Sequence, residues 1–340
     1  MRVVVITQDP LLAQEVGRLA AAAGVCPDTV GLRDGLGVWA SAAVVLVGVD
    51  LLDQVCAAGP ARRDGVHVVG LGTQEAGVFR AAVGVGAHTV AELPSSQGWL
   101  VELLSDLDAP SVRGRVVGVL GGSGGVGAST LACALAQVGA RSGPTVILDA
   151  DPLGAGADRM LGLELEEGVR WADLVRSPGR LAARALRESL PRTRGLGVLT
   201  WGPGERAELV PDVAREAVAA ARRGHDLVVL DPGRQLGGTP LDLLGRCDQI
   251  LVVASPTVPG LAATVRVLSG MGHLAARAVL VLREGPVPAD DVEAATRCRV
   301  LTTMRDQRGL GEAVDLGLGP VRSYRSATGR VASEILAWVA

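Results

Sequence analysis

A glycine-rich loop beside two hydroxyl side chains is the stretch of this 340-residue sequence best suited to chemistry. Residues 116–136 read VVGVLGGSGGVGASTLACALA: an apolar run, five glycines, a Ser-Thr pair and an Ala/Leu-rich segment. Small residues let backbone N–H groups approach an anion closely, and a helix N-terminus attracts negative charge. The order strand, glycine loop, helix therefore predicts a phosphate-binding loop. A structural glycine turn is the alternative, and so many glycines in so short a segment disfavour it.

The loop lacks the positive charge that such loops usually carry. A P-loop places a lysine directly before its Ser or Thr, and here that position is Ala128. All 33 basic residues are arginine, so the chain contains no lysine at all. This composition excludes a P-loop lysine, a Schiff-base lysine and any other catalytic lysine.

Acidic residues follow two further apolar runs. Residues 145–148 lead into Asp149 and Asp151, and residues 227–230 lead into Asp231. Carboxyl ends of parallel strands lie at one edge of a sheet, where open α/β folds bind ligands. We therefore expect these carboxylates on the same edge as the glycine loop. The stretch HDLVVLDPG has the form of a Walker B strand, which directs one Asp toward Mg²⁺ or its water shell.

Strand patterns alternate with helical patterns around these residues. This alternation predicts an α/β fold with two doubly wound parallel-sheet domains. A first domain over 1–104, a linker over 105–115 and a second domain over 116–340 are expected. In the first domain, apolar runs alternate with helical patterns. The expected strands are Val3–Ile6, Ala42–Val49, Val66–Leu71 and Thr89–Leu93, and the expected helices are Leu11–Ala23 and Glu75–Val83. In the second domain, we expect one helix over Trp171–Leu190, an edge strand over Arg299–Thr302 and a closing helix from about Gly329.

The first domain resembles a response-regulator receiver domain, most clearly in FRAAVGVGAHTVAELP. Most of the receiver chemistry is missing: Gly48 stands where the phospho-acceptor Asp belongs, only Asp9 remains of the acidic pair, and Leu93 replaces the lysine before the terminal Pro. We predict a degenerate receiver-like domain that serves docking or dimerisation and is not phosphorylated. An unrelated flavodoxin-like domain is the alternative.

Four motifs of the second domain together resemble the MinD/ParA family of deviant Walker A ATPases. They are SGGVGAST, DAD, VVLDPG and ILVVASPTVPGL. With a receiver-like domain in front, the chain is most similar to the CpaE/TadZ branch, and within it to actinobacterial CpaE-like septum-site-determining proteins. The resemblance implies an ATP-dependent homodimer that acts as a positional switch at a membrane, pole or septum.

The resemblance also assigns roles to individual residues. It implies that Asp151 positions the attacking water, that Asp231 is the Walker B acid, and that Ser129 and Asp231 hold Mg²⁺. The residues it places around ATP are Gly124, Gly125, Val126, Gly127, Ala128, Ser129, Thr130 and Asp149.

Three departures from the family pattern bear on activity. Ser123 replaces the signature lysine that reaches across the dimer, and Ala128 replaces the lysine on the β- and γ-phosphates. Arg283 stands near the position where the family often reads adenine with Asn. Phosphoryl transfer depends mainly on positioning and charge stabilisation. We therefore expect weak nucleotide binding with slow or absent ATP hydrolysis, unless an arginine substitutes for the lysine.

Two alternative functions stay open. The first is a localisation scaffold of the same fold that does not hydrolyse nucleotide. The second is a Rossmann dinucleotide-binding protein, because Gly122–Gly127 also matches GxGxxG and Asp149 follows a little over twenty residues later.

Charge and composition limit the classes of binding partner and the cellular compartment that we expect. A net charge of −3 gives no general attraction to nucleic acid, and none is predicted as a partner. The five scattered cysteines and the absence of a long apolar run predict a cytoplasmic protein. Recruitment to the inner face of the membrane stays open, although we expect the last helix, GRVASEILAWVA, to pack on the sheet. Division, pilus or secretion proteins are the expected partners, through the N-terminal domain.

Overall fold

The chain forms two compact units, Met1–Ser111 and Val112–Ala340. The computed structural model describes residues 2–105, 114–177, 179–202 and 208–340. Most of the linker expected over 105–115 lies outside the described residues. Each unit is described by itself.

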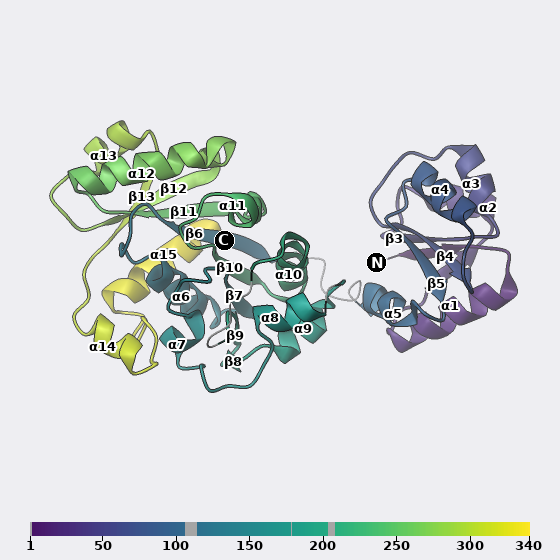
Figure 1. The fold of residues 1–340 in the computed structure, drawn as a ribbon, viewed down its shortest axis with the longest axis horizontal. Coiled ribbons are helices and arrows are strands. Elements are labelled where there is room, and N and C mark those ends of the chain that lie inside the picture. Colours follow the sequence, from purple (N-terminus) through teal and green to yellow (C-terminus); the bar gives the residue numbers. More distant parts are fainter. Residues whose placement is uncertain (1, 106–113, 178, 203–207) are drawn as a thin grey trace. The chain divides into compact units, whose positions relative to one another are not determined.

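The first unit is a five-stranded parallel sheet in the order β2-β1-β3-β4-β5 (Figure 1). Helices α1 and α5 pack on one face, and α2, α3 and α4 on the other. This is the doubly wound order of flavodoxin-like and receiver domains, so the predicted fold class is confirmed. Its elements are β1 (Val3–Ile6), α1 (Pro10–Ala22), β2 (Asp28–Val30), α2 (Leu32–Val38), β3 (Val44–Gly48), α3 (Leu52–Ala58), β4 (Val66–Leu71), α4 (Ala76–Val85), β5 (Thr89–Leu93) and α5 (Gln97–Ser105).

The second unit is built on an eight-stranded sheet in the order β13-β12-β11-β6-β10-β7-β9-β8. All pairs are parallel except β8 with β9, which form an antiparallel hairpin at one edge. The strands are β6 (Arg115–Gly121), β7 (Thr145–Asp149), β8 (Arg192–Thr193), β9 (Leu196–Leu199), β10 (Leu227–Asp231), β11 (Gln249–Ala254), β12 (Ala278–Arg283) and β13 (Val300–Met304).

This strand order argues against a Rossmann dinucleotide fold. There, the first and second strands are neighbours, whereas β10 lies between β6 and β7 in this sheet. One consequence is that the glycine loop after β6 and Asp231 at the end of β10 lie at the same edge of adjacent strands.

Helices cover both faces of this sheet, because the strands are apolar on both sides. Val117 and Val119 of β6 face α6, α7 and α15, whereas Val116 and Leu120 face α8 to α13. The helices are α6 (Ala128–Gly139), α7 (Ala157–Leu161), α8 (Trp171–Arg176), α9 (Ala183–Ser189), α10 (Pro211–Gly224), α11 (Gly238–Gly245), α12 (Val258–Gly270), α13 (Ala289–Thr296), α14 (Leu310–Asp315) and α15 (Ala327–Val339), with a 3₁₀ turn η1 (Gly272–Arg277).

Two expectations about helices can be compared with this layout. The single helix expected over Trp171–Leu190 is wrong, because α8 ends at Arg176 and α9 begins at Ala183. The closing helix α15 packs on α6 and β13 through Val331, Ile335 and Val339. Among the described residues, no helix combines the length and apolar character needed to cross a bilayer.

Candidate functional site

The glycine loop joins β6 to α6 at the carboxyl edge of the sheet. Its last residue, Gly127, caps the helix with φ 98°, a left-handed conformation that side chains rarely adopt. Ala128, Ser129 and Thr130 then form the first turn of α6, where backbone N–H groups have no partner within the helix. The local sequence therefore produces a helix start of the kind that binds anions, and phosphate binding here stays a prediction.

A pocket of about 370 Å³ opens at this loop. Most of the predicted site residues line it together, although Gly124 and Asp149 do not belong to its lining. The lining residues are Gly121, Ser123, Gly125, Val126, Gly127, Ala128, Ser129, Thr130, Asp151, Ala155, Met160, Asp231, Gly233, Arg234 and Val314.

Ser129 and Asp231 meet across the pocket. Ser129 at the start of α6 and Asp231 at the end of β10 both line it. Burial raises the pKa of Asp231, the hydrogen bonds from Ser129 and from the Gly233 N–H oppose that rise, and the negative charge of Asp151 adds to it. A cation bound here would favour the ionised carboxylate.

Asp151 also lines the pocket and lies against the loop that follows β10. A Cβ atom at residue 233 would lie 2.7 Å from Cγ of Asp151, and Gly233 has φ 73°. Only glycine meets both conditions without strain. The glycine of the DPG segment thus allows Asp151 and Asp231 to share one pocket.

Asp149 is buried behind these groups, with 4% of its surface exposed. Its Oδ2 accepts hydrogen bonds from the Thr200 hydroxyl (2.8 Å) and the Ala157 N–H (2.9 Å), and its Oδ1 accepts from the Asp151 N–H (3.2 Å). Burial, followed by the charge of Asp231, raises the pKa of Asp149 to about 7. The side chain therefore holds the backbone that carries Asp151, and a direct contact with nucleotide stays a prediction.

The donor set around Ser129 suits magnesium. Mg²⁺ is usually held by one or two protein oxygens together with substrate phosphates and waters, and the Ser129 hydroxyl and Asp231 carboxylate supply such a pair. Within the described ranges, no group of three or more His, Cys, Asp or Glu side chains forms a self-sufficient metal cage. The chemistry therefore fits a metal that arrives with phosphate.

Two arginines beside the loop were not singled out from the sequence as phosphate ligands. Arg283 donates from Nη1 to the Val126 carbonyl (3.3 Å) and pairs with Asp306. Arg234 lines the pocket directly after the DPG segment. Its place just after the strand that ends in Asp231 was the signal available in the sequence.

In the first unit, Gly48 stands where receiver domains have the phospho-acceptor Asp. The side chain of Asp50 fills the space that a side chain at Gly48 would take. A Cβ atom at Gly48 would overlap the Asp50 carboxylate. That carboxylate accepts hydrogen bonds from the Thr7 hydroxyl (2.8 Å), the Gln8 N–H (2.7 Å) and the Asp9 N–H (3.2 Å). Asp50 therefore braces the turn after β1.

Comparison of this sequence with known proteins finds a family model for the first unit and a relative that spans most of the chain. Residues 6–115 match the family model described as Rv3660c-like, CheY-like N-terminal domain. The uncharacterized protein Rv3660c of Mycobacterium tuberculosis (strain ATCC 25618 / H37Rv) is 35% identical over 321 residues, which cover 91% of this chain and 90% of that protein.

Solved structures show the fold of the second unit. A ParA family ATPase from Chlorobium tepidum TLS has a TM-score of 0.60 at 16% identity, covering 68% of this chain and all of that one. The septum site-determining protein MinD from Pyrococcus horikoshii OT3, complexed with Mg-ADP, has a TM-score of 0.54 at 16% identity, covering 66% and 95%. The second unit therefore has a MinD/ParA-like fold.

Proposed function

Because the chain belongs to the Rv3660c-like family and its second unit has the MinD/ParA fold, we propose that it is a nucleotide-binding positional switch. ATP with Mg²⁺ is the proposed ligand of the pocket after β6. Residues 124–130 bind the phosphates through backbone N–H groups, while Ser129 and Asp231 hold the metal.

The observation that carries this proposal is the meeting of Ser129 and Asp231 beside the glycine loop. A structural glycine turn needs neither a hydroxyl at the helix start nor an acid on the adjacent strand. Here both lie in one pocket with Asp151. Bound Mg²⁺ would offset the burial that disfavours the Asp231 charge.

Hydrolysis is proposed to be slow or absent. Asp151 is available to orient a water, but Ser123 and Ala128 leave the loop itself without positive charge. Removing one well-placed donor from a transition state typically costs about 3–4 kcal/mol. In this proposal, ATP binding controls the formation of the dimer, and hydrolysis contributes little.

The cellular role is proposed from the resemblance to CpaE-like septum-site-determining proteins. In this scheme the homodimer is cytoplasmic and is recruited to the membrane, pole or septum. The first unit docks a division, pilus or secretion protein.

A scaffold that never hydrolyses nucleotide is the second candidate function. The absence of every lysine favours it, and so does the buried position of Asp149. In this case the protein keeps its fold and the docking role of the first unit but does not hydrolyse ATP.

Calorimetric titration with ATP·Mg²⁺, paired with a phosphate-release assay, tests these functions. The matched control is Asp151→Asn, which keeps the shape of the pocket. Binding with Asp151-dependent phosphate release supports the active switch. Binding with no release above the control supports the scaffold, and no binding at all rejects the nucleotide switch.

A further inference from the structure

We propose that Arg234 supplies the phosphate-binding cation that the glycine loop lacks. This inference rests on the proposed function, since it names a ligand of the same pocket. The ligand contacted is the terminal part of a nucleoside triphosphate. The argument depends on where the guanidinium lies, what else it binds and how its backbone is held.

The guanidinium of Arg234 lies over the glycine loop. Its Nη1 is 2.8 Å from the position that a Cβ at Gly124 would occupy, and its Cζ is 3.4 Å from it. The approach is open because residue 124 has no side chain. A cation from the loop after β10 thus reaches the loop after β6, although the two are more than a hundred residues apart in sequence.

Arg234 is also available for a ligand. Its side chain is exposed at the mouth of the pocket, and across the described ranges it makes no hydrogen bond or ion pair. Arg283 differs, because its guanidinium is engaged with the Val126 carbonyl and with Asp306. Of these two arginines, Arg283 braces the loop and Arg234 is the one free to bind phosphate.

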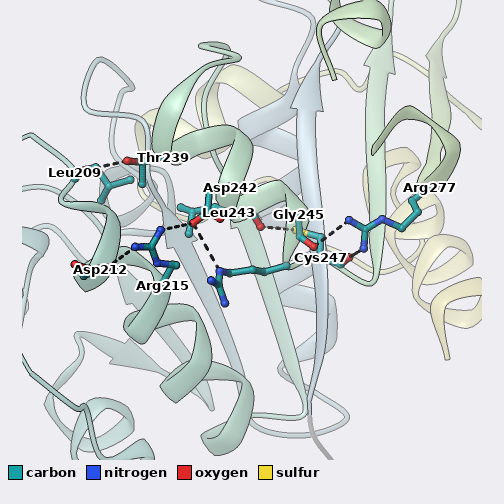
Figure 2. A network of polar contacts seen from close by, with 10 residues as sticks. Leu209, Asp212, Arg215, Thr239, Asp242, Leu243, Gly245, Cys247 and Arg277 are labelled. Atoms are coloured by element: carbon teal, nitrogen blue, oxygen red, sulfur yellow. Dashed lines mark hydrogen bonds and ion pairs between the residues drawn. The ribbon is translucent and has the colours of Figure 1, made fainter. Parts of the chain in front are cut away.

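The segment that carries Arg234 is anchored on both sides. On one side, the Gly233 N–H donates to Oδ1 of Asp231 (3.2 Å). On the other, Figure 2 shows α11 tied to its neighbours: the Thr239 hydroxyl donates to the Leu209 carbonyl (3.2 Å), and Arg215 pairs with Asp242 (3.1 Å).

The end of α11 is fixed in the same way. Arg277 donates to the carbonyls of Cys247 (2.7 Å) and Gly245 (3.0 Å), as Figure 2 also shows. Residues 232–237 therefore span a short gap between two fixed elements, which keeps Arg234 near the pocket.

The charge of the site calls for such a cation. Asp151 and Asp231 line the same pocket, and Oδ1 of Asp149 accepts a hydrogen bond from the Asp151 N–H (3.2 Å), so three carboxyl groups lie close together. Triphosphate adds further negative charge. A guanidinium can bind two phosphate oxygens at once, so one arginine can compensate for part of the missing lysine charge.

The position of Arg234 predicts which phosphates it contacts. It follows Asp231 by three residues, and Asp231 with Ser129 would hold the Mg²⁺ that neutralises charge on the terminal phosphates. Arg234 therefore lies near the terminal phosphates, and its loss should weaken ATP binding more than ADP binding.

The experiment is a titration of the full-length protein with fluorescent ATP and ADP analogues in the presence of Mg²⁺. Wild type is compared with Arg234→Ala, with Arg234→Lys, and with Arg266→Ala as a control. Arg266 is an exposed arginine of α12 that does not line the pocket. Thermal melting of each variant checks the fold.

We expect Arg234→Ala to weaken ATP binding by about 10- to 100-fold and ADP binding by less, with an unchanged melting temperature. Arg234→Lys should recover part of the loss, and Arg266→Ala should match wild type. Equal ATP affinity of wild type and Arg234→Ala would overturn the inference and leave the proposed function standing. A lowered melting temperature with equal losses for both nucleotides would also overturn it. If wild type binds neither nucleotide, the proposed function fails and the inference with it.

Discussion

Ser129 and Asp231 line the same pocket, although they are about a hundred positions apart in the sequence. Asp231 ends β10, and Ser129 lies in the first turn of the helix that follows the neighbouring strand β6. This pair is the simplest place to test whether the pocket binds a metal with phosphate.

Replacing Ser129 with Ala should make nucleotide binding insensitive to Mg²⁺. Wild type is expected to bind ATP about tenfold more tightly with Mg²⁺ than with EDTA, a difference of about 1.4 kcal/mol. The alanine variant loses one metal ligand, so its two affinities should converge. Ser129→Thr, which keeps a hydroxyl, is the control, and a full magnesium effect in the alanine variant would contradict the assignment.

Asp149 should make folding stability depend on pH. Its pKa is about 7 in the folded protein and about 3.9 when unfolded. The group therefore stabilises the fold fully below about pH 4, and this contribution is lost as the pH rises toward 7. Compared with Asp149→Asn, which does not titrate, wild type should lose roughly 3 kcal/mol between pH 5 and pH 8. Urea unfolding at both pH values measures this, and a constant difference between the two proteins would count against a raised pKa.

Gly233→Ala should destabilise the protein. The left-handed backbone and the nearby Asp151 carboxyl both oppose a Cβ atom there, at a cost of roughly 1–3 kcal/mol. Gly237→Ala is the matched control, because its φ of −170° suits any residue and a Cβ there meets nothing within 4 Å. The comparison is made by thermal unfolding, and similar melting temperatures for the two variants would refute the close approach of Asp151.

Arg283→Ala should weaken ATP and ADP binding to the same extent. Arg283 holds the Val126 carbonyl, so its removal loosens the loop without removing a contact to the terminal phosphate. We expect a loss of about 3- to 10-fold for both nucleotides, the size of one ordinary hydrogen bond. The same titration that tests Arg234 measures it, and a loss confined to ATP would instead assign Arg283 to the phosphate.

Ile335→Ala should destabilise the second unit by about 2–5 kcal/mol, because Ile335 is completely buried in the core beneath α15. Binding to anionic vesicles should not change. Unchanged stability together with lost vesicle binding would show that the helix serves a membrane and not the core.

The sequence predicted the sheet class and the loop well because both depend on local patterns. Buried parallel strands such as Val66–Leu71 are continuous apolar runs, and the loop is a run of glycines. Strand β2 was missed because its three residues, Asp28–Val30, carry no apolar run. The break between α8 and α9 was missed because the periodicity on both sides is helical.

The parts of the site that could not be predicted are those made by tertiary contact. Nothing in the local sequence indicates that Arg234 lies over Gly124, since that contact depends on which strands are neighbours. Asp149 and Asp151 follow the same apolar run, and the local pattern does not indicate which of them is buried. Only the hydrogen bonds from Thr200 and Ala157 distinguish the buried acid from the one that lines the pocket.

The position of Asp50 has a consequence for how the first unit could receive a signal. Its carboxylate already accepts three hydrogen bonds at the turn after β1, and an acyl phosphate there would have to break them. We therefore expect this unit to respond to the local concentration of a partner and not to the supply of a phosphodonor. Its output would then follow a binding isotherm, reversing as fast as the partner dissociates and needing no phosphatase to reset it.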